Sequence, residues 1–510
     1  MALREEMKVD VYSHSVKVSR YYQQGKEALL SFCKQMVEYK LRHVRGGKFV
    51  REMARVYAAS TKDRQEFRFH INVLKDLLKH LKQWGYGDDR LKIVNHSMYR
   101  PTPISLPIRS HFKPRDYQVK PIEYIVENDS RTKILVIQTG KGKSLMSLIA
   151  LSHIGHRVAL IIKGMFVDKW IADIQESCDV SKDSVMVVRG SKDLKRLIEL
   201  GKEDELNAKV IIITNKTLYN YYKAYEGKSG RRFGYECKPE DLFKVLGVGV
   251  RLIDEVHLDF HLNFKIDLYS HVPKTVSLSA TMTSDDPFIN RMYEIMFPLD
   301  IRFKGIAFDR YIGVKALFYK AENIRHIRYI GRSRSYSHVM FEQSVMKNPK
   351  ILKKYLDLIV NVVNTSYIDK KDPGQKMLIF CSSVEMCTVL VKHLKKLYPQ
   401  LDVRRYVSED DYSNLLEADV SVSTIKSAGT AVDIPDLRTC LMTDALSSRQ
   451  ANEQTVGRLR RLKRWPDVTP EFLYLVCEDI PQHIRYHERK VKVLGDKVLN
   501  HKVFHLGTRI

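Results

Sequence analysis

Short apolar runs recur along the chain, and each is followed by a longer segment with helical spacing. Strands of a parallel sheet that is buried on both faces have this composition, and parallel strands need long crossover connections, usually helices. The pattern predicts an α/β protein with two parallel sheets in tandem. The first set of runs is Lys133–Gln138, Arg157–Ile162, Lys209–Ile213, Val250–Ile253 and Thr275–Leu278. The second set is Lys376–Phe380, Asp402–Val407, Asp419–Ser423, Arg438–Thr443 and Glu471–Val476.

The segments outside these runs predict the remaining domain organisation. Lys8–Ser19 alternates like an exposed strand or a hairpin, and Phe67–His70 has strand composition. Gly25–Leu41 and Val73–Trp84 have the spacing of amphipathic helices, whereas the prolines of Arg100–Pro107 indicate a linker. We therefore expect a small α+β accessory domain at 1–105, a first α/β domain at 106–300, an interdomain basic linker or hairpin at 301–347, a second α/β domain at 348–480, and a basic tail, helical or a surface arm, at 481–510.

The chain carries a large excess of positive charge, with 86 Lys and Arg against 60 Asp and Glu and a net charge of +26. A solubilising surface would account for this excess. A nucleic-acid partner would account for it as well, because Lys and Arg contacts to phosphates release condensed counterions. Charge alone leaves both explanations open.

The seven cysteines contain no CxxC pair, so the sequence indicates neither a zinc knuckle nor a disulfide framework. We expect reduced cysteines in a cytoplasmic setting. The charged start of the chain lacks the apolar core of a signal peptide, and runs such as Ile134–Ile137 are too short to cross a bilayer. We therefore expect no membrane partner.

One loop has the residues that a phosphate-binding site needs. Gln138-Thr139-Gly140-Lys141-Gly142-Lys143-Ser144 follows a predicted strand directly and opens the predicted helix Leu145–His153. Glycines let successive backbone N–H groups point at a phosphate, Lys143 can reach the β- and γ-phosphates, and Ser144 can bind Mg²⁺. A strict Walker A motif has glycine in place of Ile137, so the first turn of this loop must differ.

A second motif ends an apolar strand in two adjacent carboxylates, Asp254 and Glu255. Asp254 can hold the Mg²⁺ shell, and Glu255 can orient and deprotonate an attacking water, as nucleotide hydrolysis requires. A solvated acidic strand end is the alternative, which the upstream phosphate loop disfavours. His257 and His261 stand four residues apart, but their sequence HLDFH lacks the HExxH pattern of zinc proteases.

Together with Ser279-Ala280-Thr281, these motifs stand in the order of motifs I, II and III of superfamily 2 helicases, which the chain resembles. The resemblance implies two RecA-like domains in tandem. Thr430-Ala431 departs from the usual motif V. The further similar segments are Arg115-Asp116-Tyr117-Gln118 (the adenine-reading Q element), Ile379–Ser383 (motif IV), Ser423-Thr424 through Gly429-Thr430-Ala431-Val432-Asp433 (motif V) and Gln454–Arg461 (QxxGRxxR, motif VI).

The resemblance implies an ATP site divided between the two domains. Arg458 and Arg461, expected one helical turn apart on one face, would then stabilise the charge of the transferring phosphoryl group. The implied catalytic residues are Lys143, Glu255, Gln454, Arg458 and Arg461. The implied ATP-binding set is Arg115, Gln118, Thr139, Gly140, Lys141, Gly142, Lys143, Ser144, Gly429 and Asp433. Ser144 and Asp254 would hold Mg²⁺, and His257, Ser279, Ala280 and Thr281 would couple hydrolysis to motion.

Nucleic-acid contacts are expected on the opposite rim, where short polar side chains and lysines hold phosphates without reading bases. Lys163 replaces a proline of many relatives and could be an ordinary exposed lysine. Arg325, Arg328, Arg332 and Arg334 form a second candidate strip, or a solvated hairpin. The candidate contacts are Lys163 and Phe166 (motif Ia), Thr214, Asn215 and Lys216 (motif Ib), Ser383 (motif IV), and Thr424 with Lys426 (motif V).

The chain length and the small first domain are similar to those of phage UvsW-like helicases, of DExH type. This similarity implies branch migration, fork regression and D-loop or R-loop unwinding in phage-type recombination and replication. It implies a monomer in the host cytoplasm that acts on branched DNA, with a single-strand-binding or recombination protein as a possible partner. An RNA or RNA–DNA track stays open, as does a double-strand translocase driving a partner, which the tryptophan-containing segment Lys169–Asp173 resembles.

Overall fold

The computed structural model describes residues 6–43, 49–60, 65–138, 140–228, 234–284, 286–303, 309–331, 335–407, 410–428 and 434–510. The chain divides into two compact units. The first comprises Met1–Arg42 and Arg51–Ile306, and the second comprises His43–Val50 and Ala307–Ile510. The first unit contains a small N-terminal sheet and a large parallel sheet, and the second contains another large parallel sheet.

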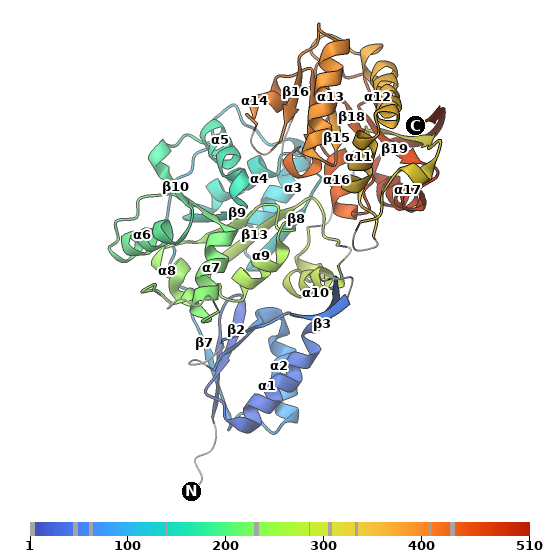
Figure 1. Ribbon diagram of the computed structural model, residues 1–510. Helices are drawn as coiled ribbons and strands as arrows, with labels where there is room; N and C mark the ends of the chain where they lie inside the picture. Colours follow the sequence, from blue (N-terminus) through green and yellow to red (C-terminus); the bar gives the residue numbers. More distant parts are fainter. Residues whose placement is uncertain are drawn as a thin grey trace. The chain divides into compact units, whose positions relative to one another are not determined.

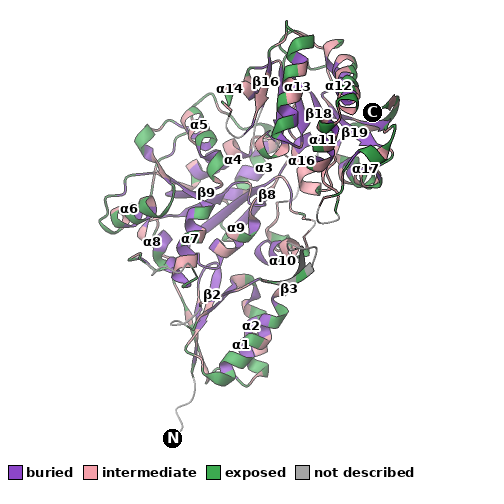
Figure 2. Ribbon diagram, viewed as in Figure 1, coloured by how far each residue is buried: buried purple, intermediate pink, exposed green. Residues whose placement is uncertain are grey.

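Within the described residues of the first unit, six parallel strands form the large sheet, in the order β10-β11-β9-β12-β13-β8. Figure 2 shows β9, an inner strand, and β8, an edge strand, both as largely buried ribbons. Five strands confirm predicted runs, whereas β10 was not predicted. The strands are β8 (Thr132–Val136), β9 (Val158–Ile162), β10 (Val185–Val188), β11 (Val210–Thr214), β12 (Val250–Ile253) and β13 (Lys274–Ser279).

Helices connect the parallel strands, as this topology requires. α3 packs against α4 and α4 against α5, whereas α7 packs against α9 and α9 against α10. Their paths can be followed in Figure 1. The helices are α3 (Asp116–Val126), α4 (Lys143–Ile154), α5 (Val167–Ser177), α6 (Ser191–Lys202), α7 (Asn215–Tyr225), α8 (Leu242–Val245), α9 (Phe260–Asp267) and α10 (Pro287–Met296).

The N-terminal region forms a mixed sheet in the order β5-β6-β2-β1-β7, with α1 and α2 packed together beside it (Figure 1). The predicted hairpin and the predicted strand at Phe67–His70 are confirmed. The helix predicted to reach Leu41 ends at Gln35, because the chain continues as β3. The elements are β1 (Met7–Val11), β2 (Ser15–Ser19), α1 (Gln23–Gln35), β3 (Val37–His43), β4 (Phe49–Arg55), β5 (Ala58–Ala59), β6 (Phe67–His70), α2 (Leu74–Gln83) and β7 (Leu91–Asn95), with β3 and β4 pairing separately.

Buried charged side chains join the N-terminal sheet to the large sheet domain. His70 Nε2 donates to Asp267 Oδ2 at 2.7 Å, and Arg251 binds the other oxygen of the same carboxylate. Glu240 accepts from Lys17 at 2.8 Å and from Arg68 at 3.0 Å. One apolar cluster also extends across this junction. The accessory region predicted at 1–105 therefore shares a core with the domain that follows it.

Within the described residues of the second unit, seven parallel strands form a sheet in the order β16-β17-β15-β18-β19-β14-β20. Alternate residues of β15 enter two apolar clusters, Met377 and Ile379 in one, Leu378 and Phe380 in the other. Such alternation places one cluster on each face of the sheet. The strands are β14 (Gly313–Lys320), β15 (Lys376–Cys381), β16 (Val403–Tyr406), β17 (Val420–Thr424), β18 (Leu437–Met442), β19 (Glu471–Cys477) and β20 (Asn500–Arg509). The helices are α11 (His338–Lys347), α12 (Pro349–Val363), α13 (Val384–Leu397), α14 (Ser413–Leu416), α15 (Ile425–Ala428), α16 (Arg449–Val456) and α17 (Pro481–Leu494).

Two segments differ from their predicted roles. The stretch 301–347, predicted as a linker or hairpin, contains β14, which lies between β19 and β20 in the sheet. The stretch 481–510, predicted as a basic tail, contains the expected helix α17 and then β20, an edge strand. β14 is buried on both faces, because Val314 and Phe318 enter one cluster and Leu317 and Tyr319 the other.

The ion pairs of Glu240 with Arg68 and Lys17 predict how the stability of the first unit changes with pH. Burial opposes ionisation of this carboxyl, but Arg68 and Lys17 outweigh burial and lower its pKa to about 2. Its stabilisation is therefore complete above the unfolded pKa near 4.5 and is lost as pH falls toward 2. At pH 7, Glu240→Gln should lower the free energy of unfolding by about 3 kcal/mol, because Arg68 keeps its buried charge.

Urea unfolding at pH 7, 5 and 4 checks this prediction. The difference between wild type and Glu240→Gln should narrow below about pH 4.5. Glu199→Gln, which removes an exposed carboxylate of α6, is the control and should behave as wild type. A difference that stays constant over this pH range contradicts the prediction.

Candidate ATP site and nucleic-acid contacts

The phosphate loop lies between β8 and α4, as predicted. Gly140 and Gly142 have φ values of 85° and 79°, in the left-handed region that favours glycine. A Cβ at Gly142 would lie 2.6 Å from Gln118 Nε2, so this position has no room for a side chain. α4 begins at Lys143, and its amino terminus faces the loop. Thr139 lies outside the described residues.

Lys143 joins the phosphate loop to the acidic motif. Its ammonium donates to Ile137 O at 3.3 Å and lies 3.5 Å from Glu255 Oε1. Only 8% of the residue is exposed. A buried lysine beside a carboxylate is positioned to exchange that partner for a phosphate oxygen.

The Q element contacts the back of the same loop. Gln118 accepts from Arg115 N at 3.0 Å, which caps α3, and donates from Nε2 to Lys141 O at 2.9 Å. The Gln118 amide therefore positions the loop backbone. Its adenine-reading role, and that of Arg115, stay predictions.

The Asp254 carboxylate is held at the end of β12 by two donors. Oδ2 accepts from Trp170 Nε1 at 2.8 Å, and Oδ1 accepts from Glu255 N at 2.8 Å. Burial raises the pKa of the Asp254 carboxyl, and the neighbouring Glu255 carboxylate raises it further. Like-charge repulsion and low exposure are the conditions under which a carboxylate gains most from a cation. Ser144, the second predicted Mg²⁺ ligand, accepts from Lys169 Nζ at 3.3 Å.

Trp170 was not predicted as part of the site. Its side chain is fully buried in α5, and its indole N–H fixes the orientation of Asp254. The sequence showed only that the tryptophan-containing segment Lys169–Asp173 resembles one of double-strand translocases. Sequence spacing could not show which strand end the Trp170 indole reaches. Trp170 acts through Asp254 and is a positioning residue.

The predicted coupling residues connect the acidic motif to motif III. His257 Nδ1 and Ser279 Oγ lie 2.8 Å apart, and Ser279 Oγ accepts from Thr281 N at 3.1 Å. Ser279 O also accepts from Ile137 N at 3.0 Å, at the start of the phosphate loop. Ala280, which lies between Ser279 and Thr281 in the sequence, is half-buried. Three consecutive motifs are therefore linked by hydrogen bonds along one sheet edge.

The motif VI residues belong to the second unit and differ from the predicted arrangement. α16 ends at Val456, so Arg458 and Arg461 do not share a helix face. Arg458 is buried, and its Nε donates to Gln454 O at 3.2 Å. Arg461 is exposed and forms a two-pronged pair with Asp309, at 2.6 and 3.0 Å. Gly429 and Asp433, the other predicted ATP contacts of this unit, lie outside the described residues.

The predicted nucleic-acid contacts of the first unit fall into two groups. Lys163 and Lys216 are accessible, although Lys163 pairs with Asp259 at 3.0 Å. Phe166 and Asn215 are buried, and so is Thr214, which caps α7. The buried residues can shape this edge, but their side chains do not present a contact surface.

In the second unit, Lys426 is exposed, whereas Ser383 and Thr424 are buried. The Ser383 hydroxyl and N–H donate to Glu342 at 2.5 and 2.8 Å. Burial raises the pKa of the Glu342 carboxyl to about 7, although these hydrogen bonds oppose the shift. Thr424 Oγ1 lies 3.0 Å from Ser427 Oγ. Of the candidate arginine strip, Arg332 and Arg334 lie outside the described residues.

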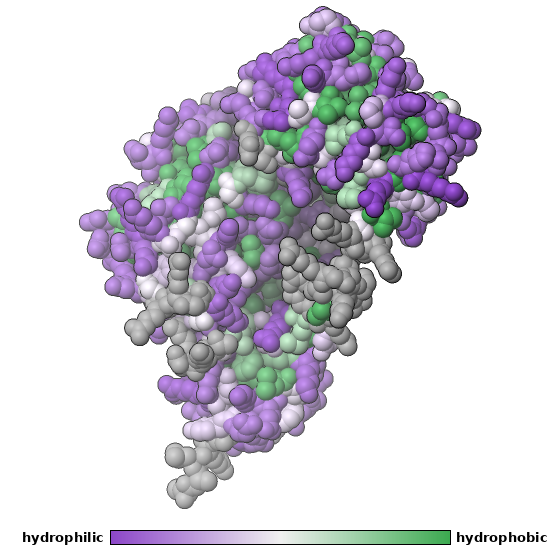
Figure 3. All heavy atoms as spheres, in the orientation of Figure 1, coloured by the Kyte–Doolittle hydropathy of each residue, from purple (hydrophilic) through white to green (hydrophobic). Residues whose placement is uncertain are grey.

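Hydrophilic side chains cover most of the molecular face in Figure 3. Among the described residues, no helix combines the length and apolar character needed to cross a bilayer. The described residues also contain no group of three or more His, Cys, Asp and Glu side chains arranged around a metal site. Mg²⁺ does not require such a group, because it keeps several waters and binds through one or two protein ligands and substrate phosphates.

Comparison with known proteins gives a family match that covers this site. Residues 111–284 match the family model ResIII, described as type III restriction enzyme, res subunit. No curated protein matches the chain in sequence.

Solved structures share the fold of the chain at low sequence identity. S. cerevisiae Dbp5 bound to RNA and ADP BeF3 superposes with a TM-score of 0.51 at 14% identity, covering 77% of this chain and 90% of that chain. A variant of Dbp5 with the same ligands gives a TM-score of 0.52, also at 14% identity, with coverages of 78% and 90%. The chain therefore has the tandem RecA-like fold that its sequence predicts.

The family match and the tandem fold support an ATP-hydrolysing nucleic-acid helicase.

Two substitutions should separate nucleotide binding from hydrolysis. Lys143→Ala should lower ATPase activity at least 100-fold and weaken nucleotide binding, because the ammonium is the cation of the loop. Glu255→Gln should lower kcat about 10²–10⁴-fold with nucleotide binding retained, because only the general base is lost. Steady-state ATPase and binding of a fluorescent ATP analogue measure both effects. Lys192→Ala, on the exposed face of α6, is the control. Full activity in Lys143→Ala would refute the assignment.

Trp170→Phe should raise the Mg²⁺ concentration for half-maximal ATPase about 10–100-fold, because Asp254 loses the donor that orients it. A Mg²⁺ titration measures the shift, and circular dichroism checks the fold. Trp465→Phe, in the second unit, is the matched control and should leave the titration unchanged. A purely structural tryptophan would lower stability without moving the Mg²⁺ midpoint.

Proposed function

We propose that the chain is an ATP-driven helicase or translocase that remodels branched or structured DNA, by branch migration, fork regression or unwinding of D-loops and R-loops. The observation that carries the proposal is the convergence of Lys143, Asp254 and Glu255 at one sheet edge, inside the region matched by the restriction-subunit model. A restriction enzyme acts on DNA, which favours a DNA track. The net charge of +26 suits a polyanionic partner of either kind.

In the proposed mechanism, residues of the first unit hold and cleave ATP. The loop N–H groups and Lys143 would bind the phosphates, Ser144 and Asp254 would hold Mg²⁺, and Glu255 would orient the attacking water. Mg²⁺ would supply charge neutralisation on the phosphates. The oxygen donors at Ser144 and at Asp254, with its raised pKa, are the hard ligands that suit this ion.

Arg458 and Arg461 of the second unit are proposed to stabilise the charge of the transferring phosphoryl group. Gln454 would lie near the γ-phosphate, and Asp433 near the ribose or the interdomain seam, with Gly429 as a further ATP contact. His257, Ser279, Ala280 and Thr281 would transmit the state of the site along the hydrogen-bonded motifs. The accessible lysines Lys163, Lys216 and Lys426 would contact the track. A UvsW-like, DExH-type role in phage recombination, a monomeric state and a cytoplasmic location form part of the same proposal.

An RNA helicase is the second candidate. The specific observation in its favour is that Dbp5, which shares the fold, was solved bound to RNA. The core contacts in both cases are to phosphates and sugars, so the same residues would serve either track. A double-strand translocase acting for a partner protein is a third candidate, which the tryptophan-containing segment Lys169–Asp173 resembles.

Stimulation of ATPase activity by a matched panel of nucleic acids tests the proposal. Forks, Holliday junctions, D-loops and R-loops should stimulate hydrolysis at least 10-fold more than single-stranded RNA of equal length. Strand displacement on the same substrates should depend on Lys143. Stimulation by RNA alone would favour the second candidate. Triplex displacement without strand separation would favour the third, and no stimulation by any nucleic acid would reject all three.

A further inference from the structure

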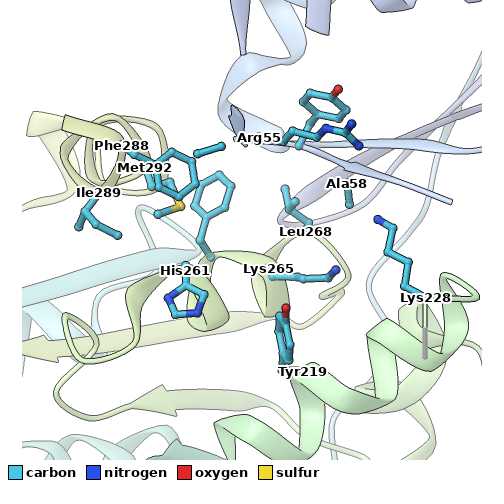
Figure 4. A pocket seen from close by; sticks show the side chains of 13 residues that line it. Arg55, Ala58, Tyr219, Lys228, His261, Lys265, Leu268, Phe288, Ile289 and Met292 are labelled. Atoms are coloured by element: carbon cyan, nitrogen blue, oxygen red, sulfur yellow. The ribbon is translucent and has the colours of Figure 1, made fainter. Parts of the chain in front are cut away.

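A pocket lies inside the first unit, where the N-terminal region meets α7, α9 and α10 (Figure 4). Its volume is about 430 Å³, within the range of sites that bind small ligands. Arg55 and Tyr57 line it from the N-terminal region, Tyr219 from α7, Lys265 from α9 and Phe288 from α10. None of the catalytic residues lines this pocket.

The pocket has an apolar wall and a cationic wall. Figure 4 shows Phe288, Ile289 and Met292 of α10 on one side, and the nitrogen-bearing ends of Lys228 and Lys265 on the other, with Arg55 above. A nucleotide has the same division, because its base is a flat apolar surface and its phosphate is an anion. Bases stack on aromatic side chains without regard to sequence, and cations follow the backbone.

The charges around the pocket leave it electropositive. Lys265 and Lys228 share one carboxylate, Glu226, at 2.6 and 3.0 Å. The Arg55 guanidinium lies 5.9 Å from the centre of the Tyr57 ring. Among the described lining residues, three are cations and none is a carboxylate, so an anion would balance the surplus.

The helices that line the pocket begin at functional motifs. α7 begins at Asn215, next to the predicted contact Lys216, and α9 and α10 follow motifs II and III. Lys216 and Tyr219 are three residues apart on α7, so they share a face and lie about 4.5 Å apart along the axis. A strand that contacts Lys216 can therefore continue into the pocket.

We propose that this pocket binds one nucleotide of a single strand, with its phosphate on Arg55 and Lys228 and its base against Tyr219 and Phe288. The inference rests on the proposed function, because it extends the nucleic-acid track onto the N-terminal region. Single-stranded DNA and RNA share this chemistry, so the test includes both.

Charge reversal tests the cationic wall. Fluorescein-labelled dT12 and U12 are titrated with wild type and with the double variant Arg55→Glu/Lys228→Glu, both sites being exposed. We expect at least 10-fold weaker binding and a slope of log K against log salt smaller by about 0.7, because one phosphate is no longer neutralised. The double variant Lys192→Glu/Lys195→Glu, an equal charge change at two exposed sites on α6, should bind as wild type.

Removal of an aromatic ring tests stacking. Tyr219→Ala should weaken binding about 10-fold, whereas Tyr219→Phe, which keeps the ring, should stay within 2-fold of wild type. Thermal unfolding verifies that each variant is folded. The stronger of the dT12 and U12 responses identifies the natural strand.

Crosslinking provides a test that needs no variant. Wild type irradiated with dT12 or U12 carrying 5-iodouracil should give adducts at Tyr219 or Phe288. Adducts confined to other peptides, unchanged affinity in both the charge and ring variants, or equal competition by a blunt duplex would overturn the proposal. Absence of any binding by wild type would instead reject the proposed function, so the two failures are distinguishable.

Discussion

Every described strand of the two large sheets runs parallel to its neighbours, and the candidate site depends on this constraint. Parallel strands present their carboxyl ends at a single edge. β12, β13 and β8 are adjacent, so the acidic motif, motif III and the phosphate loop leave the sheet side by side. The hydrogen bonds from Ile137 to Ser279 and from His257 to Ser279 follow directly from that order. A residue pair more than 100 positions apart, such as Lys143 and Glu255, comes together because the intervening helices return each strand to the same end.

The electrostatics of the two units differ in a way that suits their proposed roles. In the first unit, Asp254 and Glu255 are neighbouring carboxylates that gain from a cation. In the second, Asp309 already neutralises Arg461 and raises the pKa of its guanidinium. Any phosphate that binds Arg461 must therefore compete with an internal carboxylate.

The sequence predicts most of the sheet core but little of its edges. Runs such as Val250–Ile253 are continuously apolar, because both faces of a central strand are buried, and so they were found. β20 was not predicted, because an edge strand with exposed His, Lys and Arg side chains has no apolar pattern. β14 was not predicted, because Gly313 and Lys315 interrupt its apolar run and because it follows an irregular stretch.

Some residues of the candidate site could likewise be identified from the sequence, and others could not. The phosphate loop and Asp254-Glu255 were recognised as a candidate site from their motif spacing, and the structure places Lys143 Nζ 3.5 Å from Glu255 Oε1. Trp170 could not be found, because its role depends on which strand end its indole reaches in space. The predicted helical spacing of Arg458 and Arg461 was wrong because α16 ends at Val456, before either arginine.

The buried ion pairs between the N-terminal sheet and the large sheet domain limit where the first unit can be truncated. Asp267 and Glu240 lie on the large sheet domain, yet part of their hydrogen bonding comes from His70, Lys17 and Arg68 of the first hundred residues. Cutting the chain near residue 105 would not release an intact ATPase core. The buried charges of Asp267 and Glu240 would lose part of their partners, and apolar surface would be exposed to water. The smallest fragment that keeps this shared core intact is the span from the first strand to the end of the large sheet domain. One of these ion pairs ties the N-terminal region to α9, which begins at Phe260, shortly after Asp254 and Glu255.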